Sequence, residues 1–173
     1  GAPLSVTSVR NIIMAANSAL SSSSGAHNVD FNADANGNLS VDGRPGAAIS
    51  LDGARIESNG GNIRFYGQCD PTKRRAAWGE QGGGAAKING LELQGILLRD
   101  SVVPTCAQGQ DACSGGGSIS LRGQGGTVTP SEGSIGSAGV GVASYGSTLR
   151  SGSGAIALDG FGGIGASGVL TDF

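Results

Sequence analysis

One stretch of this sequence returns later in the chain with nearly the same pattern of residues. Residues 53–67 read GARIESNGGNIRFYG, and residues 146–160 read GSTLRSGSGAIALDG. The two stretches align without a gap, and the identical positions are Gly53/Gly146, Ser58/Ser151, Gly61/Gly154, Ile63/Ile156 and Gly67/Gly160. Apolar and glycine positions that match at fixed offsets indicate one structural unit that is used more than once.

The glycine content limits what this unit can be. The chain has 34 glycines among 173 residues, and so much glycine is typical of collagen, of disorder or of repeated tight turns. Collagen is excluded because the glycines have no three-residue period. Short groups of Ile, Val, Leu and Phe recur between the glycines, which argues against full disorder. Repeated turns between short strands remain.

Each repeat contains three short apolar segments. The first is a pair of apolar residues two positions apart: Ile12/Met14, Ile49/Leu51, Leu91/Leu93 and Val140/Val142. The second is a single apolar residue: Leu20, Ile56, Leu98 and Leu149. The third is another pair: Val29/Phe31, Ile63/Phe65, Ile119/Leu121 and Ile156/Leu158. Alternation within a pair predicts a short strand, and Val169-Leu170 opens a fifth unit.

Stacking of these units would place equivalent side chains on top of one another. A single unit cannot bury its own apolar residues, whereas a stack encloses a continuous core. The sequence therefore predicts one all-β domain over residues 1–173, a parallel β-helix or a closely related solenoid. Glycine suits its corners, where φ is often positive. The predicted core stack consists of Val29, Phe31, Ile63, Phe65, Ile119, Leu121, Ile156 and Leu158.

Extra length collects in two segments that are predicted to be loop insertions. Residues 68–87 read QCDPTKRRAAWGEQGGGAAK and residues 102–114 read VVPTCAQGQDACS. The polar stretch 123–139 is predicted to be a longer corner. In the segment 9–20, VRNIIMAANSAL, a short helix competes with a strand, and the strand is preferred because the following residues continue the repeat.

The first insertion holds the best candidates for contact with a ligand: Lys73, Arg74, Arg75 and Trp78. Basic side chains bind sulfate or carboxylate groups, and an exposed indole stacks on the apolar face of a sugar ring. An acidic glycan is the ligand that this combination favours. The alternative is a solvated loop with Trp78 packed against the shaft.

Three cysteines are present. Cys106 and Cys113 enclose a short polar loop that a disulfide would pin, whereas Cys69 stands apart; the alternative is three unpaired thiols. Four ligands at metal spacing are not found, so no metal site is predicted.

No catalytic residue and no cofactor are predicted. His27 is the one histidine, no G-x-S-x-G motif surrounds a serine, and the sequence GFGGIG at 160–165 is interpreted as a turn. Residues 34–38 do not fit the spacing of a calcium loop. Equivalent charged positions mix signs: Asp30 with Arg64 and Glu57 with Arg99 are predicted ion pairs rather than paired acids.

Some classes of partner are disfavoured by charge and hydropathy. The net charge of −2 argues against a duplex nucleic-acid binder. No run of about 18 apolar residues occurs, so no membrane insertion is predicted.

Four segments carry a resemblance to a known family. The segments NVDFNADANG, AAISLDGARIESNGGNIRFYG, GGSISLRGQGG and GSTLRSGSGAIALDGFGG look like the shaft repeats of filamentous-haemagglutinin-type exoproteins, from about residue 11 to residue 171. These are large bacterial adhesins exported by two-partner secretion, and some are labelled as haem-utilisation proteins. The resemblance implies a right-handed parallel β-helix of four to five coils.

The resemblance also implies a location and a role. It implies an internal segment of a secreted, cell-surface exoprotein whose full-length form uses an outer-membrane transporter partner. Its role would be attachment to a host-surface glycan or protein. The alternatives are a polysaccharide lyase or hydrolase built on a β-helix and a haem-related binding module. The two insertions depart from plain shaft repeats, so the resemblance implies nothing about their function.

Overall fold

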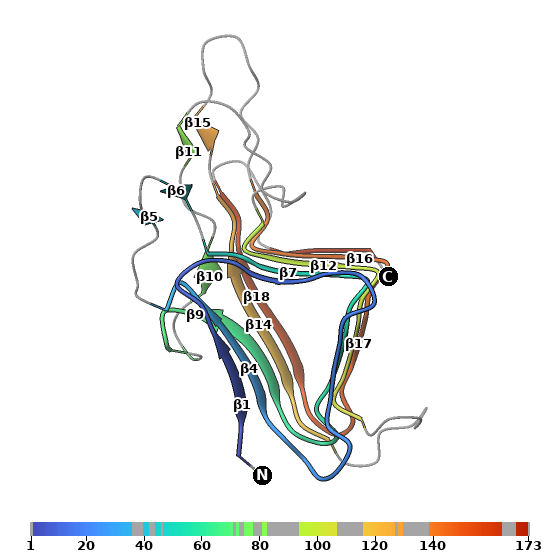
Figure 1. Cartoon of the computed structure of the whole chain (residues 1–173). Coiled ribbons are helices and arrows are strands. Elements are labelled where there is room, and N and C mark those ends of the chain that lie inside the picture. Colours follow the sequence, from blue (N-terminus) through green and yellow to red (C-terminus); the bar gives the residue numbers. More distant parts are fainter. Residues whose placement is uncertain are drawn as a thin grey trace.

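The computed structural model describes twelve stretches of the chain: 2–35, 40–41, 44–45, 47–70, 72, 75–77, 81–82, 94–106, 116–126, 128–129, 139–163 and 169–172. Within these residues all regular structure is strand, and no helix occurs. Most strands belong to three parallel sheets, which enclose a triangle when seen along the direction of stacking (Figure 1). The arrangement is consistent with a parallel β-helix.

The chain visits the three sheets in the same order again and again. Sheet A contains β1 (Leu4–Thr7), β4 (Val29–Ala33), β9 (Ile63–Gly67), β14 (Ile119–Gln124), β18 (Ile156–Phe161) and the short β10 (Ala76–Ala77). Sheet B contains β2 (Ile12–Met14), β7 (Ile49–Asp52), β12 (Ile96–Arg99), β16 (Val142–Tyr145) and β19 (Val169–Asp172). Sheet C contains β3 (Ala19–Ser21), β8 (Arg55–Glu57), β13 (Val102–Pro104) and β17 (Thr148–Arg150).

Two further strand pairs lie outside these sheets. β5 (Ser40–Val41) pairs antiparallel with β6 (Arg44–Pro45), and β11 (Gln81–Gly82) pairs parallel with β15 (Val128–Thr129). The pairing of β15 falls within the stretch 123–139, which was predicted to be a corner. The preference for strand in the segment 9–20 is confirmed by β2 and β3.

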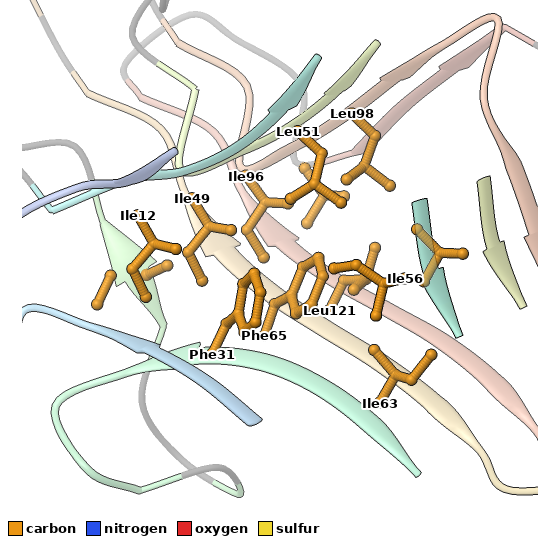
Figure 2. Close-up of a cluster of buried hydrophobic side chains, with 14 of the residues drawn as sticks. Ile12, Phe31, Ile49, Leu51, Ile56, Ile63, Phe65, Ile96, Leu98 and Leu121 are labelled. Atoms are coloured by element: carbon orange, nitrogen blue, oxygen red, sulfur yellow. The ribbon is translucent and has the colours of Figure 1, made fainter. Parts of the chain in front are cut away.

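Apolar residues of successive strands lie over one another inside the triangle. In sheet A, one column is formed by Leu4, Val29, Ile63, Ile119 and Ile156, each paired with the next. The predicted core residues Val29, Phe31, Ile63, Phe65, Ile119 and Leu121 are buried. Figure 2 shows side chains from all three sheets meeting at the centre.

The aromatic pair in sheet A shows how close this stacking is. The rings of Phe31 and Phe65 are stacked, with centroids 5.0 Å apart and planes inclined by 14°. Each is at most 2 % exposed. Full burial of such a side chain contributes about 1.5–3 kcal/mol, so the columns hold the strands together.

The prediction that Ile156 is buried is wrong. Ile156 keeps its place in the column, opposite Ile119, but its side chain is 43 % exposed. Leu158 is partly buried against the core. The reason is position: β18 is the last described strand of sheet A, and no described strand pairs with its outer edge.

The predicted register of the third unit is also wrong. Ile96 and Leu98 of β12 pair with Ile49 and Leu51, so they form the apolar pair of this unit. Leu98, predicted to be the single apolar residue, is replaced in that role by Val103, which pairs with Leu149. The predicted pair Leu91/Leu93 lies outside the described residues.

The apolar pair of the fourth unit is displaced in the same direction. β16 places Val142 opposite Ile96 and Ser144 opposite Leu98. Val140, predicted to be in this pair, precedes the strand and packs instead with a second apolar cluster around Ala48, Leu97 and Ala143. A serine in an apolar column gave no hydrophobic signal.

The corner between sheets B and C requires a left-handed backbone conformation. Each passage contains one residue with positive φ: Asn17 (66°), Gly53 (60°), Asp100 (47°) and Gly146 (56°). Gly and Asn/Asp are the residues that adopt this conformation most readily. The prediction of positive φ at glycine corners is confirmed at Gly53 and Gly146, but Asp100 carries no glycine signal.

Parts of both predicted insertions form strands. The segment 102–114 begins with β13, which belongs to sheet C, so its first residues are part of the stack. Within 68–87, Ala76–Ala77 form β10 and pair with Gly123 and Gln124 of β14, beyond the residues of β14 that pair with β9.

Candidate functional site

The predicted ligand-contact residues lie in the segment that follows β9. Lys73, Arg74 and Trp78 lie outside the described residues. Arg75 is described, and its side chain is only 22 % exposed. The question is therefore where the chain puts Arg75 and what its guanidinium contacts.

The backbone turns sharply before it reaches Arg75. Residues 68–69 both have φ of 57°, and the Asp70 carboxylate accepts hydrogen bonds from the Thr72 backbone N–H (2.9 Å) and hydroxyl (2.7 Å). The chain then rejoins sheet A as β10. A Cβ atom on Gly67 would lie 2.3 Å from the Arg75 carbonyl oxygen, so glycine permits this close approach.

Arg75 reaches across the neighbouring strand β14 to β18. One terminal nitrogen of its guanidinium donates to both carboxylate oxygens of Asp159, at 3.1 Å each. The same guanidinium lies over the ring of Phe161, 3.9 Å from the ring centroid. Arg122 of β14 also contacts Asp159, at 2.6 Å. We call Arg75, Arg122, Asp159 and Phe161 the arginine cluster.

The arginine cluster joins the inserted segment to the stack. Two guanidinium groups share one carboxylate, so the three ionised side chains carry a net positive charge. The Nε atoms of Arg75 and Arg122 are buried and have no hydrogen-bond acceptor among the described residues. The contacts of Arg75 make it an anchor for the segment. Its guanidinium, which was expected to bind a ligand, is already in contact with the Asp159 carboxylate and the Phe161 ring.

The sequence reasoning missed Arg122, Asp159 and Phe161. A signal was present, because β14 and β18 align as ISLRGQ and IALDGF, with Arg122 opposite Asp159 and Gln124 opposite Phe161. Residues directly opposite one another on neighbouring strands interact. The contact of Arg75 with this pair carried no such signal, since Arg75 lies far from it in the sequence.

A second charged pair confirms one prediction. Arg64 donates two hydrogen bonds to Asp30, from Nε to Oδ1 (2.6 Å) and from a terminal nitrogen to Oδ2 (2.7 Å). This hydrogen bonding to Asp30 raises the pKa of Arg64. Tyr66, on the same strand, is 8 % exposed, and its burial, followed by the charge of Asp30, raises its pKa above 10.0.

The predicted pair of Glu57 with Arg99 is wrong. Glu57 is buried and its Oε1 accepts from Arg55 of the same strand, with Nε at 2.7 Å. Arg99 lies instead 3.8 Å from Asp52. The shifted register of the third unit explains the difference, because Arg99 ends β12 in sheet B whereas Glu57 belongs to sheet C.

The outer surface of β4 is covered by the turn after β9. Asn32 is 3 % exposed, and its side chain makes two contacts with Cys69: Oδ1 accepts from the backbone N–H (3.0 Å) and Nδ2 donates to Sγ (3.1 Å). Gln68 donates to Asp34 (3.0 Å). β4 is therefore buried on both faces. Its polar side chains serve to hold neighbouring segments of the fold together.

The cysteines take different roles. Cys106 is disulfide-bonded, whereas Cys69 is a free, exposed thiol. Cys113, the predicted partner of Cys106, lies outside the described residues, so this pairing stays a prediction.

His27 lies beside a cavity at the end of the stack where β1 lies. Its Nδ1 is 3.2 Å from the Ala2 carbonyl oxygen and its Nε2 is 3.1 Å from the Ser24 carbonyl oxygen. Both neighbouring atoms are backbone carbonyl oxygens, so whichever ring nitrogen carries a proton has an acceptor. The cavity has a volume of about 280 Å³ and is lined by Leu4, Leu20, Ser21, Ser22, Ser23, Ser24, His27, Val29 and Glu57.

The described residues contain no group of three or more His, Cys, Asp or Glu side chains placed to hold a metal ion. The described part of the chain also has no helical segment with the length and hydrophobicity needed to span a bilayer. No family model, curated protein or solved structure matches the chain.

Proposed function

We propose that this chain is a structural and adhesive segment of a large secreted bacterial adhesin. In this proposal the chain forms one domain, a right-handed parallel β-helix of four to five coils. The coils form a stiff shaft, and the parts of the segments 68–87 and 102–114 outside β10 and β13 project from it as loops. The loops contact a glycan or a protein on the host surface, and the full-length protein reaches the cell surface with an outer-membrane transporter partner.

The observation that supports a shaft is the continuous register of three parallel sheets. Ile49, Ile96 and Val142 lie opposite one another in sheet B, just as Ile63 and Ile119 do in sheet A. In such a stack each rung rests on its neighbours, so length is gained by adding rungs without a change of core. The rise of each rung is about 4.8 Å.

The arginine cluster supports the display of the first loop. Arg75 directly follows Lys73 and Arg74 in the sequence. Its contacts with Asp159 and Phe161 attach this end of the segment to β18. A loop anchored in this way loses less conformational freedom when it binds a partner. In this proposal Lys73, Arg74 and Trp78 make the contact, and Arg75 holds the segment in place.

A binding assay with an acidic-glycan array and purified host-surface glycoproteins tests the display role. We expect the unmodified chain to bind, and the double variant Arg74→Ala/Trp78→Ala to lose binding. Arg99→Ala is the matched control, because Arg99 is an exposed arginine of sheet B with a distant partner, Asp52 at 3.8 Å. Absence of binding by the unmodified chain would leave the shaft role alone.

The enzyme alternative has a direct test of its own. Incubation with polyuronates would release unsaturated products if the chain were a polysaccharide lyase. In sheet A the outward acids Asp30 and Asp159 contact arginines, whereas hydrolysis of a glycosidic bond needs two carboxyl groups facing each other across it. The adhesive proposal expects no product.

A further inference from the structure

Phe161, the last residue of β18, contacts two separate segments of the chain. The guanidinium carbon of Arg75 lies over its ring, 3.9 Å from the ring centroid. Its backbone carbonyl accepts a hydrogen bond of 2.7 Å from the N–H of Gly125, the residue that follows β14. Phe161 therefore connects the segment that follows β9 with the segment that follows β14.

These two segments also pair with each other at two places. β10 pairs with the end of β14, and further along the chain β11 pairs with β15. Ala76 is opposite Gly123 and Gln81 is opposite Val128, so both segments keep one register from the first pair to the second. Figure 1 shows β11 and β15 beside each other outside the triangle of sheets. We call Arg75, β10 and β11 together the arm.

The residues that are proposed to bind a ligand adjoin the arm in the sequence. Lys73 and Arg74 directly precede Arg75, and Trp78 directly follows β10. The backbone on which these residues depend is therefore fixed by Arg75 and by the pairing of β10 and β11. What fixes Arg75 then matters for binding.

The contact of Arg75 with Asp159 is the part of this arrangement that depends on charge. One terminal nitrogen of Arg75 lies 3.1 Å from each Asp159 oxygen, and Arg122 contacts the same carboxylate at 2.6 Å. Arg122 thus helps to hold the carboxylate in place for Arg75. The Asp159 side chain is 34 % exposed, and a partly exposed ion pair contributes little to global stability. Substitution of Asp159 should therefore leave the fold intact.

We infer that Asp159 and Phe161 are positioning residues for ligand binding by the arm. Through Arg75 they hold the arm in the orientation in which its neighbours contact an acidic glycan, and they do not contact the glycan themselves. The inference rests on the proposed function, because it takes Lys73, Arg74 and Trp78 as the contact residues. An arm that is already ordered loses less conformational freedom when it binds.

The opposite role for Asp159 would be competition with the ligand. In that case its carboxylate would occupy the Arg75 guanidinium in place of an acidic group of the glycan, and removal of the carboxylate would strengthen binding. The geometry favours positioning, because Arg75 is held by the Phe161 ring as well as by charge and leads directly into β10. The two roles predict opposite signs for one substitution.

Binding of the full chain to heparin, used as the acidic glycan, measures this sign. We expect Asp159→Asn to weaken binding by about tenfold, because the arm must then be ordered on binding. Loss of a negative charge alone would strengthen attraction to a polyanion, so the net charge cannot explain weaker binding. Asp159→Glu keeps the carboxylate and should restore most of the affinity.

Asp30→Asn is the matched control. Asp30 also lies on sheet A and pairs with an arginine, but its partner is Arg64 of β9 rather than the arm. The change of charge is the same, so Asp30→Asn should bind heparin at least as well as the unmodified chain. Stronger binding by Asp159→Asn overturns the inference in favour of competition. Equal affinities of Asp159→Asn and Asp30→Asn also overturn it.

The role of Phe161 has its own pair of variants. Phe161→Ala removes the ring under the Arg75 guanidinium and should weaken heparin binding, whereas Phe161→Tyr keeps a ring that attracts a cation and should restore it. Unchanged binding by Phe161→Ala would show that the ring does not position the arm.

Limited digestion with trypsin measures the hold on Arg75 without a ligand. Cleavage within a folded chain follows local opening, and mass spectrometry gives the rate of cleavage between Arg75 and Ala76. We expect this rate to increase several-fold in Asp159→Asn and to stay unchanged in Asp30→Asn. Equal rates in the unmodified chain and in Asp159→Asn overturn the inference, because Arg75 would then be held without Asp159.

Failure of this inference is distinguishable from failure of the proposed function. Heparin binding that is the same in the unmodified chain and in Asp159→Asn removes the positioning role and leaves the contact residues. Absence of binding by the unmodified chain to heparin and to every other acidic glycan overturns the proposed contact and this inference with it. Circular dichroism spectra and melting transitions equal to those of the unmodified chain verify that the variants are folded.

Discussion

At the scale of single residues, the buried polar side chains separate into satisfied and unsatisfied groups. Ser147 is satisfied: its Oγ accepts from the Ser101 backbone N–H (3.0 Å) and donates to the Tyr145 carbonyl (3.1 Å). Ser144 is fully buried in the column of Leu98, and its Oγ has no hydrogen-bond partner among the described residues. A buried hydroxyl without a partner destabilises the fold.

Ser144→Ala should therefore raise the free energy of unfolding by about 1 kcal/mol, because it removes an unsatisfied hydroxyl with little change of volume. Ser147→Ala should lower it by about 1 kcal/mol or more, because the Ser101 N–H would lose its acceptor. Urea denaturation of both variants measures the difference. A loss of stability in Ser144→Ala equal to that of Ser147→Ala would contradict this assignment.

Tyr66 gives the fold a dependence on alkaline pH. Its pKa in the folded state is raised above 10.0 by burial and then by Asp30, so the folded chain holds the phenolic proton more tightly than the unfolded chain. This contribution to stability is complete below pH 10.0 and is lost as the pH rises through the folded pKa.

We expect the melting temperature to fall above pH 10.0 and Tyr66→Phe to reduce that fall. Melting curves of both proteins over this pH range measure the effect. The same alkaline fall in the variant would show that other groups cause it.

At the scale of elements, the sequence predicted strands well and their register less well. Alternating apolar residues placed β4, β9 and β14 correctly, because both members of each pair are apolar and face the core. The third and fourth units were misplaced because two apolar pairs compete in LELQGILL, and because Ser144 replaces an apolar residue in β16. β1 was missed, since Leu4 and Val6 precede any recognisable repeat.

The corners explain the rest of the error in register. Asp100 occupies the position that Gly53 and Gly146 occupy in their units, and its φ is 47°. An aspartate in the sequence predicts a left-handed corner less clearly than a glycine does. Its contact with Gly146 is close: a Cβ on Gly146 would lie 2.5 Å from Asp100 Oδ1. Within the arginine cluster, the contacts of Arg75 with Asp159 and Phe161 join segments that are far apart in the sequence, and a repeat pattern does not encode such contacts.

Substitution of Asp100 tests the corner. Asp100→Val should lower the free energy of unfolding by roughly 1–2 kcal/mol or more, because a β-branched residue is strained at positive φ. Asp100→Gly should keep nearly the original stability. Asp52→Val is the control for loss of an aspartate, since Asp52 is exposed; chemical denaturation of the three variants compares them. Equal losses in Asp100→Val and Asp52→Val would show that the backbone conformation does not matter.

At the scale of the whole molecule, the fold follows from repetition. Each passage through the three sheets adds one member to every core column, and the side chains that are buried in the middle become exposed at the ends. Ile119 and Ile156 illustrate this: they lie opposite one another in the same column, yet Ile119 is fully buried and Ile156 is 43 % exposed.

A comparison of the stabilities of the two single variants Ile119→Asp and Ile156→Asp tests the stacked core most directly. Guanidinium unfolding of the two variants, in a Cys69→Ser background at a low, equal protein concentration, compares the same change at two levels of one column. We predict that Ile119→Asp loses several kcal/mol of its free energy of unfolding and does not fold stably, because it buries an unpaired charge. Ile156→Asp should unfold at a guanidinium concentration close to that of the unmodified chain. Similar stability of the two variants would contradict the stacked core.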